Sequence, residues 1–417
     1  MDLEAQILAQ LKSAREASRS LALCPTERKN AALMSLAEAL RANCRTILDA
    51  NRKDLEVAKN SGRAGAFLER LTLSDARIAA MAKSVEEVAA LPDPVGEVIE
   101  RWSRPNGLEI HKVRVPLGVI AMIYESRPNV TIDAGVLTFK SGNAVVLRGG
   151  KEALGANTML ARMLVRSLEN AGIDSAAIQF IDTPDRDAIH ILKRHPEALD
   201  LIIPRGGGTL KEALAGSAVP LMPHFEGKCH TYVDRAADLK MAEVICFNAK
   251  VSRPSVCNAM EKLLVHREVA ANFLPAMAKR FIAAGVELRG DEVTCSIVPN
   301  IKHATDEDWD AEYLDMILAV KVVDSIDEAI DFIARHGSSL ADAIVTQDQN
   351  AAARFEREVD SATVYVNAST RFTDGFEFGF GAETGISTNR LHARGPMGLR
   401  ELTTYKYVVR GTGQVRN

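Results

Sequence analysis

The chain has 417 residues, 47% of them hydrophobic and 25% charged, and a formal net charge of -4 at pH 7. This length predicts two or three globular domains, and the small negative charge without a basic stripe argues against nucleic acid as a partner. Scattered cysteines without a C-x-x-C pair, no signal-like start, and no apolar run near the roughly 20 residues that cross a bilayer predict a cytoplasmic protein without a membrane partner.

The first hundred residues have the pattern of amphipathic helices. Apolar residues recur at helical spacing over residues 8–17, and a longer apolar stripe follows Pro25. A further helix is predicted over about 74–90, ending before Pro92. We expect these helices to pack on a larger domain and to expose their charged side chains.

From Trp102 onward, short strands alternate with helices. Residues 108–115 alternate apolar and polar residues like a half-exposed strand. Buried strands are predicted at 118–124, 143–148, 178–181 and 199–203, with helices at about 130–140, 155–171 and 186–194. This alternation predicts an α/β fold with a doubly wound parallel sheet, which binds ligands at the carboxyl ends of its strands.

A second α/β unit is predicted from about residue 228. Its strands are expected at 230–233, 317–323 and 343–346, and its helices at about 268–284 and 326–335. A glycine-rich stretch follows over 375–398, and the β-prone tail 402–410 comes after it. The tail and the lone strand 108–115 together predict an arm that pairs with a partner subunit.

One cysteine, Cys257, follows a polar turn and precedes the apolar run 260–265. A thiol at a loop-to-strand junction is held rigidly while it faces a cleft, and thiolates attack acyl carbon readily. The alternative is a small buried hydrophobe, which is what most free cysteines are. The local residues alone favour this alternative.

Three glycine-bearing turns are candidate ligand sites. Gly206 and Gly207 follow a buried strand and open a helix, which suits a dinucleotide phosphate, although the turn lacks the G-x-G-x-x-G pattern. Arg148 and Lys151 flank a second turn with two cations that suit a phosphate-bearing ligand. The alternatives are a tight strand-to-helix turn and a solvated surface turn. The third turn, 225–228, is equally consistent with a linker.

The chain resembles the aldehyde dehydrogenase superfamily, and within it most closely the family of γ-glutamyl phosphate reductases. The resemblance covers nearly the whole length. The segments that carry it are 116–120, 124–131, 140–143, 147–152, 204–207, 224–230, 254–261, 378–383 and 395–399. So many motifs in one order make a chance match very unlikely.

The resemblance implies that Cys257 is the nucleophile. Its thiolate would displace phosphate from L-glutamyl 5-phosphate and form a thioester, which hydride from NADPH would reduce to L-glutamate 5-semialdehyde, the second step of proline biosynthesis. The oxyanion donors would be the Cys257 backbone N–H and the side chain of Asn129 or Asn258. By spacing, the oxyanion asparagine of hydrolytic relatives falls on Glu125.

Two departures from hydrolysing aldehyde dehydrogenases favour a reductase that uses NADP. The position of their water-activating glutamate is occupied by His224, and Glu226 is displaced from it. Where NAD-preferring relatives hold the adenosine ribose with a glutamate, this chain has Lys151, a cation that suits a 2′-phosphate. Glu312 falls where relatives hold the nicotinamide ribose, although a surface carboxylate is an equally consistent interpretation.

A third departure follows His336, where the family has a second histidine and a hydroxyl residue and this chain has Leu340 and Ala341. That loop's contribution to binding is therefore open. For the glutamyl carboxylate the candidates are Arg127 and Arg371, each also consistent with a structural ion pair. No metal is implied.

The resemblance implies an aldehyde dehydrogenase-like fold with two α/β domains and an oligomerisation arm. The predicted parts are a cofactor-binding domain at 1–107 and 116–227, a catalytic domain at 228–372, the arm at 108–115 and 399–417, and a returning segment at 373–398. A homodimer or homotetramer is expected, with glutamate kinase as a possible partner. The competing functions are a hydrolysing semialdehyde dehydrogenase, a cysteine hydrolase or acyltransferase, and an inactive binding protein.

Overall fold

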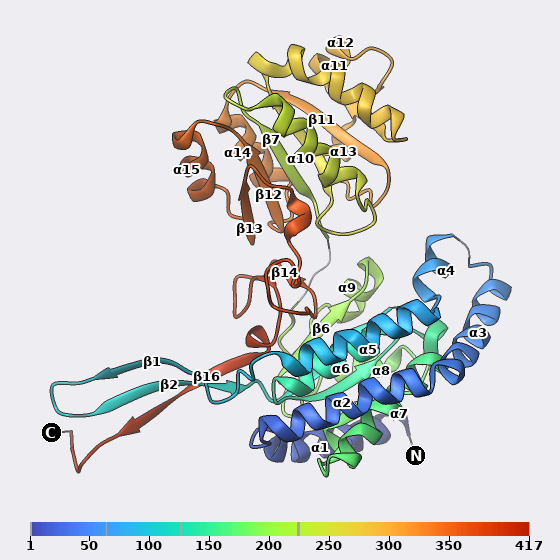
Figure 1. The fold of residues 1–417 in the computed structure, drawn as a ribbon, viewed down its shortest axis with the longest axis vertical. Helices are drawn as coiled ribbons and strands as arrows, with labels where there is room; N and C mark the ends of the chain where they lie inside the picture. Colours follow the sequence, from blue (N-terminus) through green and yellow to red (C-terminus); the bar gives the residue numbers. More distant parts are fainter. Residues whose placement is uncertain (1, 64, 126, 223–225, 417) are drawn as a thin grey trace. The chain divides into compact units, whose positions relative to one another are not determined.

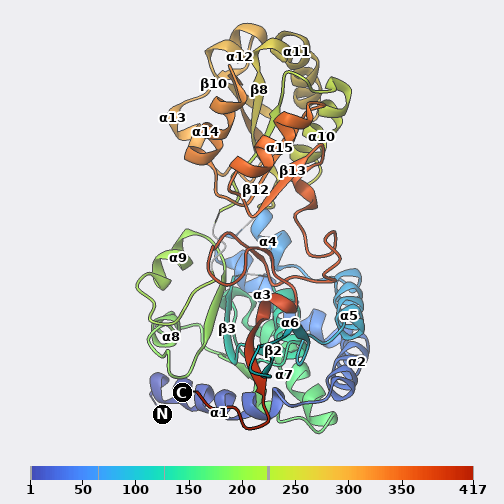
Figure 2. The same ribbon diagram turned by 90° about the vertical axis from the view of Figure 1, so that its left-hand side faces the viewer.

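The computed structural model describes residues 2–63, 65–125, 127–222 and 226–416. The chain divides into two compact units (Figures 1 and 2). The N-terminal unit comprises Met1–Phe225, Gly379–Gly385 and Met397–Asn417, and the C-terminal unit comprises Glu226–Phe378 and Ile386–Pro396. The returning segment is therefore shared between the units.

Amphipathic helices begin the N-terminal unit, as predicted. They are α1 (Leu3–Leu21), α2 (Thr26–Ala42), α3 (Cys44–Asn60), α4 (Ala66–Leu71) and α5 (Asp75–Ala90). The Ser74 side chain caps α5 by accepting a hydrogen bond from the backbone N–H of Arg77 at 3.2 Å. Helices α2 and α5 run side by side (Figure 1) and bury apolar residues such as Leu36 and Val85. Burial of these apolar stripes holds the helices on the rest of the unit.

The predicted parallel sheet of the N-terminal unit is confirmed. Its strands are β3 (Val119–Tyr124), β4 (Ala144–Arg148), β5 (Ile178–Phe180) and β6 (Leu201–Arg205), in the order β5-β4-β3-β6. The connecting helices are α6 (Asn129–Lys140), α7 (Leu154–Asn170) and α8 (Asp187–Leu192), and α9 (Gly208–Leu214) follows β6. Every residue of β3 and β4 is buried, as expected of a parallel sheet covered on both faces.

The arm is a three-stranded antiparallel sheet of β1 (Val98–Ser103), β2 (Glu109–Pro116) and β16 (Thr403–Arg410). It stands away from the helices of the N-terminal unit (Figure 1). The predicted pairing of 108–115 with the tail is confirmed, in a register that runs from Thr403 opposite Pro116 to Arg410 opposite Glu109. The sequence analysis missed β1, whose residues alternate poorly and are mostly exposed.

The C-terminal unit is a second doubly wound sheet, as predicted. Its parallel strands follow the order β10-β9-β11-β8-β7-β12-β13. They are β7 (Cys229–Val233), β8 (Met260–His266), β9 (Glu287–Gly290), β10 (Lys302–His303), β11 (Ile317–Val323), β12 (Ala341–Val345) and β13 (Thr363–Val366). The chain winds outward from β7 in one direction and later returns to place β12 and β13 on the other side of β7.

Six helices connect these strands. They are α10 (Leu239–Val251), α11 (Arg267–Ala283), α12 (Glu292–Ile297), α13 (Asp306–Asp310), α14 (Ile326–His336) and α15 (Gln349–Glu358). The sequence analysis predicted α11 and α14 and missed the others. Among the helices that the structure describes, none combines the length and apolar character required to span a membrane.

Candidate active site

Cys257 lies in a turn between α10 and β8, at the amino end of β8. Its side chain is half-buried and packs against a small apolar cluster that includes Cys229 and Ile386. The Cys229 thiol donates to the Cys257 carbonyl oxygen at 3.3 Å. The predicted loop-to-strand junction is therefore present, and contacts on its main chain hold the residue.

Gly227 makes the closest of these contacts. A side-chain Cβ at Gly227 would stand 2.0 Å from the Cys257 carbonyl oxygen and 2.6 Å from its Cα, so only glycine fits. The Gly227 N–H donates to the Glu312 carboxylate at 2.6 Å. In the described part of this turn, Gly227 therefore joins the nucleophile segment to Glu312, which a simple linker would not do.

Buried charged residues hold the backbone on either side of Glu312. The Lys262 ammonium donates to the carbonyl oxygen of Ala311, and the Glu261 carboxylate accepts from the Leu314 N–H at 3.2 Å. Burial raises the pKa of Glu312, and burial lowers the pKa of Lys262 to about 8. The half-buried Glu312, bonded to a backbone N–H, does not fit the surface-carboxylate alternative.

The sequence analysis did not select Glu261 or Lys262. Glu261 forms a 3.1 Å ion pair with Lys250, and both side chains are fully buried. The signal was available, because two adjacent charged residues in an otherwise apolar strand are rarely buried without partners. Through their bonds to the backbone of Ala311 and Leu314, Lys262 and Glu261 help to fix the position of Glu312.

Asn258 and Arg371 lie beside the nucleophile and bond to each other. The Arg371 guanidinium, in the short helix η3 (Thr370–Phe372), donates to the Asn258 side-chain oxygen. The Asn258 amide nitrogen donates to the carbonyl oxygens of Thr373 at 2.8 Å and of Arg371 at 3.4 Å. These bonds use both amide hydrogens, so Asn258 would have to exchange a partner before it could donate to an oxyanion.

The loop after His336 lies next to the same site. The Ser338 hydroxyl accepts from the Lys228 backbone N–H at 2.8 Å, and His336 bonds Asp310 at 3.0 Å. Leu340 and Ala341 are fully buried in the apolar cluster against which Cys257 packs. In this chain the loop therefore supplies Leu340 and Ala341 to the apolar cluster against which Cys257 packs.

The candidate residues of the N-terminal unit lie at the carboxyl ends of its strands. The Glu125 N–H, after β3, donates to the Arg205 carbonyl oxygen at the end of β6, at 3.1 Å. A Cβ at Gly206 would stand 2.7 Å from the Glu125 carboxyl carbon, and nothing lies within 4 Å of one at Gly207. A side chain at position 206 would therefore meet the Glu125 side chain, which accounts for a glycine there. The backbone of Gly207, in contrast, is open to a ligand.

The turn after β4 carries the two predicted cations in different settings. Arg148 is buried, it donates to the Asp185 carbonyl oxygen at 3.2 Å, and its pKa is lowered by burial and by the nearby Arg186. Lys151 is exposed and forms no hydrogen bond or ion pair with any other described residue. Arg186 was missed because it belongs to a different loop.

Arg127 and Asn129 follow β3. Arg127 is exposed, and its backbone N–H donates to the Glu125 carbonyl oxygen at 2.5 Å. The Asn129 amide donates to the Asp133 carboxylate at 2.9 Å, and burial raises the pKa of Asp133 to about 6. Both residues belong to the N-terminal unit, whereas Asn258, Glu312 and Arg371 share the C-terminal unit with the thiol.

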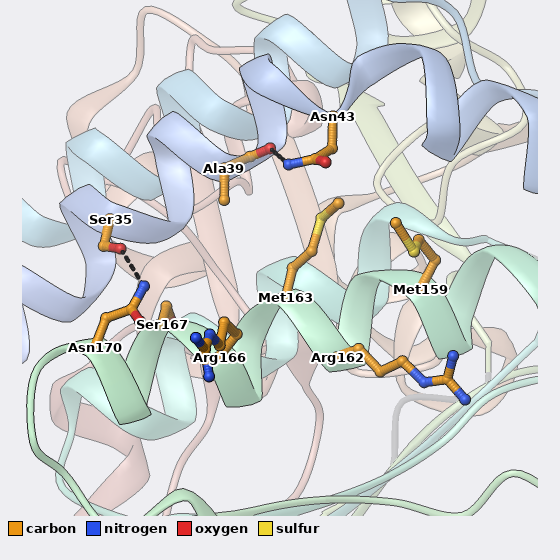
Figure 3. Close-up of a pocket in the computed structure, with 9 residues that line it drawn as sticks. All are labelled: Ser35, Ala39, Asn43, Met159, Arg162, Met163, Arg166, Ser167 and Asn170. Carbon is orange, nitrogen blue, oxygen red and sulfur yellow. Dashed lines mark hydrogen bonds between the residues drawn. The ribbon is translucent and has the colours of Figure 1, made fainter.

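A surface hollow of about 320 Å³ lies between α2 and α7 (Figure 3), away from every predicted site residue. Figure 3 shows Asn170 of α7 reaching Ser35 of α2 through a 3.3 Å hydrogen bond. The other lining residues are Ala39, Asn43, Met159, Arg162, Met163, Arg166 and Ser167. Among the described residues, no cluster of three or more histidine, cysteine, aspartate or glutamate side chains is arranged to hold a metal.

Comparison with known proteins decides the family. The model of the aldehyde dehydrogenase family matches residues 3–310 and 305–408. γ-Glutamyl phosphate reductase of Carboxydothermus hydrogenoformans is 55% identical over 99% of both chains, and that of Caldanaerobacter subterraneus is 52% identical over 99% of this chain and 100% of its own. The chain belongs to the γ-glutamyl phosphate reductases, within the aldehyde dehydrogenase family.

The fold agrees with this family. The crystal structure of γ-glutamyl phosphate reductase from Thermotoga maritima superposes with a TM-score of 0.96 at 47% identity, covering 98% of this chain and 99% of that one. As a member of the reductase family, the chain is an oxidoreductase. Of the motif residues, Ser126, His224 and Phe225 lie outside the described residues, while Glu226 pairs with Lys228 at 3.2 Å.

Proposed function

We propose that the chain reduces L-glutamyl 5-phosphate to L-glutamate 5-semialdehyde and phosphate with NADPH, the second step of proline biosynthesis from glutamate. The observation that carries the proposal is the half-exposed Cys257, held by Gly227 and Cys229 in a chain of this family. The names of relatives more than 50% identical over their full length support the substrate.

Covalent catalysis by Cys257 divides the reaction into two steps. The thiolate attacks the acyl carbon, a carbon–sulfur bond forms, and the carbon–oxygen bond to phosphate breaks, which leaves a thioester. NADPH, when bound, supplies the hydride that reduces this acyl group. The carbon–sulfur bond then breaks, and the aldehyde and the thiolate are released. The Cys257 backbone N–H is the proposed donor to the oxyanion of both steps, and the Asn129 side chain is the proposed second donor.

The cofactor is assigned to the carboxyl ends of the strands in the N-terminal unit. The exposed Lys151, with no partner among the described residues, and the open backbone at Gly207 suit a ligand with phosphate groups. Lys151, together with Arg186 from the loop near Arg148, would meet the 2′-phosphate that distinguishes NADP from NAD. Buried Arg148 would hold the Arg186 loop through Asp185. Glu312 of the C-terminal unit would accept hydroxyls of the nicotinamide ribose.

For the substrate, Arg127 and Arg371 are the proposed partners of the glutamyl carboxylate. Within the part of the chain that the structure describes, the side-chain hydrogen bonds of Arg371 use Nε and Nη1 and leave Nη2 available. Arg127 is exposed. A guanidinium binds a carboxylate with two parallel hydrogen bonds, which favours arginine over lysine here.

The thioester must be reduced by hydride before water hydrolyses it. A hydrolysing enzyme needs a general base to activate water, and the described acid in this segment, Glu226, is exposed and paired with Lys228. With histidine at position 224, the proposal assigns no water-activating base. This distinguishes the proposed reductase from the hydrolysing alternative.

The arm supports a homo-oligomer, dimer or tetramer. Tyr405, Tyr407 and Val409 of β16 are each about half exposed, and the Trp102 ring contacts Tyr407 edge-on with a centroid separation of 6.0 Å. An apolar face of this kind on a projecting sheet is typical of subunit contact. Sedimentation velocity of the full chain, compared with a Tyr407→Glu variant, tests it.

The proposed reaction is tested in reverse, by following NADP reduction with glutamate 5-semialdehyde in the presence and absence of phosphate. We expect turnover to require phosphate, and we expect Cys257→Ser to lower kcat by at least about 1,000-fold. Cys295→Ser is the matched control, since the half-buried Cys295 thiol bonds only backbone carbonyl groups, at Gly290 and Lys302. Phosphate-independent turnover, or an active Cys257→Ser enzyme, would contradict the proposal.

A further inference from the structure

The residue that follows the nucleophile is held by one short segment. Asn258 is only 4% exposed, and Thr370 and Thr373 are completely buried. The Thr370 hydroxyl donates to the Asn258 carbonyl oxygen at 2.8 Å, and the Asn258 amide donates to the Thr373 carbonyl oxygen, also at 2.8 Å. The Arg371 guanidinium donates to the Asn258 side-chain oxygen. Residues 370–373, named here the clasp, therefore bond both the backbone and the side chain of Asn258.

The clasp is itself anchored to regular structure. The Thr373 hydroxyl hydrogen-bonds the phenol of Tyr365 on β13 at 2.9 Å. Arg371 Nε donates to the hydroxyl of Ser252, directly after α10, at 3.2 Å. The Thr373 N–H closes the turn on the Thr370 carbonyl oxygen at 3.0 Å. A segment fixed to both the sheet and a helix is rigid enough to set the position of Asn258.

The nucleophile is held from the other side as well. The Cys257 carbonyl oxygen accepts from the Cys229 thiol at 3.3 Å, and its main chain lies against Gly227. Asn258 and the clasp hold the chain just beyond it. Cys257 itself is half-exposed.

We propose that the clasp sets the position of the Cys257 sulfur for attack on the acyl carbon, with Thr370 as a positioning residue. This inference rests on the proposed function of Cys257. Thr370 has no exposed surface, so it acts through Asn258 and cannot touch the substrate. Its removal should therefore change kcat and leave KM unaltered, because displacement of a reacting atom by about 1 Å costs on the order of 100-fold in rate.

The test compares Thr370→Val, which keeps the shape and loses the hydroxyl, with Thr370→Ser, which keeps the hydroxyl. Both are assayed as the full chain by NADP reduction with glutamate 5-semialdehyde and phosphate. We expect Thr370→Val to lower kcat by about 10- to 100-fold with KM within about 2-fold of wild type, and Thr370→Ser to stay within about 3-fold in kcat.

Three results would overturn the proposal. They are an unimpaired Thr370→Val enzyme, equal losses in the serine and valine variants, and a raised KM with unchanged kcat. If Thr370→Val gives no native circular dichroism spectrum, Tyr365→Phe replaces it, because this change frees Thr373 and leaves the Thr370 bond in place. Its kcat should fall by about 3- to 10-fold at constant KM, and an unchanged kcat overturns the proposal.

Cys257→Ser is assayed in parallel to separate the two proposals. An active Cys257→Ser enzyme overturns the assigned function of Cys257. An inactive Cys257→Ser enzyme beside an unimpaired Thr370→Val enzyme overturns the clasp alone.

Discussion

The two parallel sheets place their candidate residues at opposite edges. In the N-terminal unit, Glu125, Lys151 and Gly206 all follow the carboxyl ends of strands. In the C-terminal unit, Gly227 and Cys257 precede the amino ends of β7 and β8. Ligands of open α/β sheets are expected at the carboxyl edge. The cofactor site proposed for the first unit follows this rule, and the chemistry proposed for the second does not.

The difference lies in how each edge is built. The carboxyl edge consists of short local turns, each beginning directly where its strand ends. The amino edge gathers residues that are remote in sequence, namely Gly227, Cys257, Glu312 and Arg371, through specific hydrogen bonds and one close glycine contact. The helix that precedes Cys257 in sequence is α10, and the dipole at its carboxyl end does not favour a thiolate. The nucleophile therefore depends on side-chain and main-chain contacts.

The sharpest test of this contrast exchanges one glycine at each edge for alanine. Gly227→Ala drives a methyl group into the Cys257 backbone, which has to move, so we expect kcat to fall by at least about 100-fold. Gly207→Ala meets nothing within 4 Å, and its φ of -86° suits alanine. It should preserve kcat and stabilise the fold by up to about 1 kcal/mol.

Steady-state kinetics and urea unfolding of both glycine variants check this prediction. Equal kcat values for Gly227→Ala and wild type would show that the close contact at the amino edge does not position the thiol. Because the open backbone at Gly207 is the proposed phosphate site, KM for NADPH should rise in Gly207→Ala, and an unchanged KM would remove Gly207 from that site.

The charge of Lys151 provides a test of the carboxyl edge of the N-terminal sheet. Lys151→Glu replaces an exposed cation with an anion, and we expect KM for NADPH to rise by about 10- to 100-fold, with kcat nearly unchanged and NADH little affected. Lys12→Glu, on an exposed face of α1, is the matched control. Equal effects on the two cofactors would remove Lys151 from the 2′-phosphate site.

The smallest expected effect concerns Glu312 and pH. Because burial raises its pKa, the carboxylate is neutralised as pH falls through a value above the usual glutamate range, and activity is lost there. The same raised pKa means that protonation of Glu312 favours the folded state, so this group does not itself drive acid unfolding. Glu312→Gln should lower kcat/KM by about 10-fold at pH 7.5 and lack this acid limb.

Profiles of kcat/KM between pH 4.5 and 7, recorded with tryptophan fluorescence as a check on folding, measure the effect. If Glu312→Gln keeps the acid limb of the wild type, another group is responsible for it.

Much of the fold could be predicted because its signals are local. Strand and helix periodicity identified both sheets, and the alternating residues 108–115 identified the pairing with the tail. Strand β1 was missed because its mostly exposed residues lack the alternation of a buried face. The same local reasoning placed Cys257 at its junction.

The environment of Cys257 could not be predicted in the same way. The need for glycine at position 227 comes from a backbone that lies thirty residues further along the chain. Asn258 has the chemistry of an oxyanion donor, and only the structure shows that both its amide hydrogens are bonded to the clasp. Such contacts depend on how segments distant in sequence pack together, and the hydrophobic periodicity of the sequence does not predict that packing.

The pairing of β16 with β2 also affects how the chain is made. Residues 397–417 are synthesised after residues 226–378, yet they belong to the same unit as residues 1–225, whereas residues 226–378 form most of the other unit. The C-terminal unit therefore has nearly all of its residues before the N-terminal unit has its last strand. The N-terminal unit is therefore completed after the C-terminal unit, and one edge of β2 stays unpaired until β16 has been synthesised.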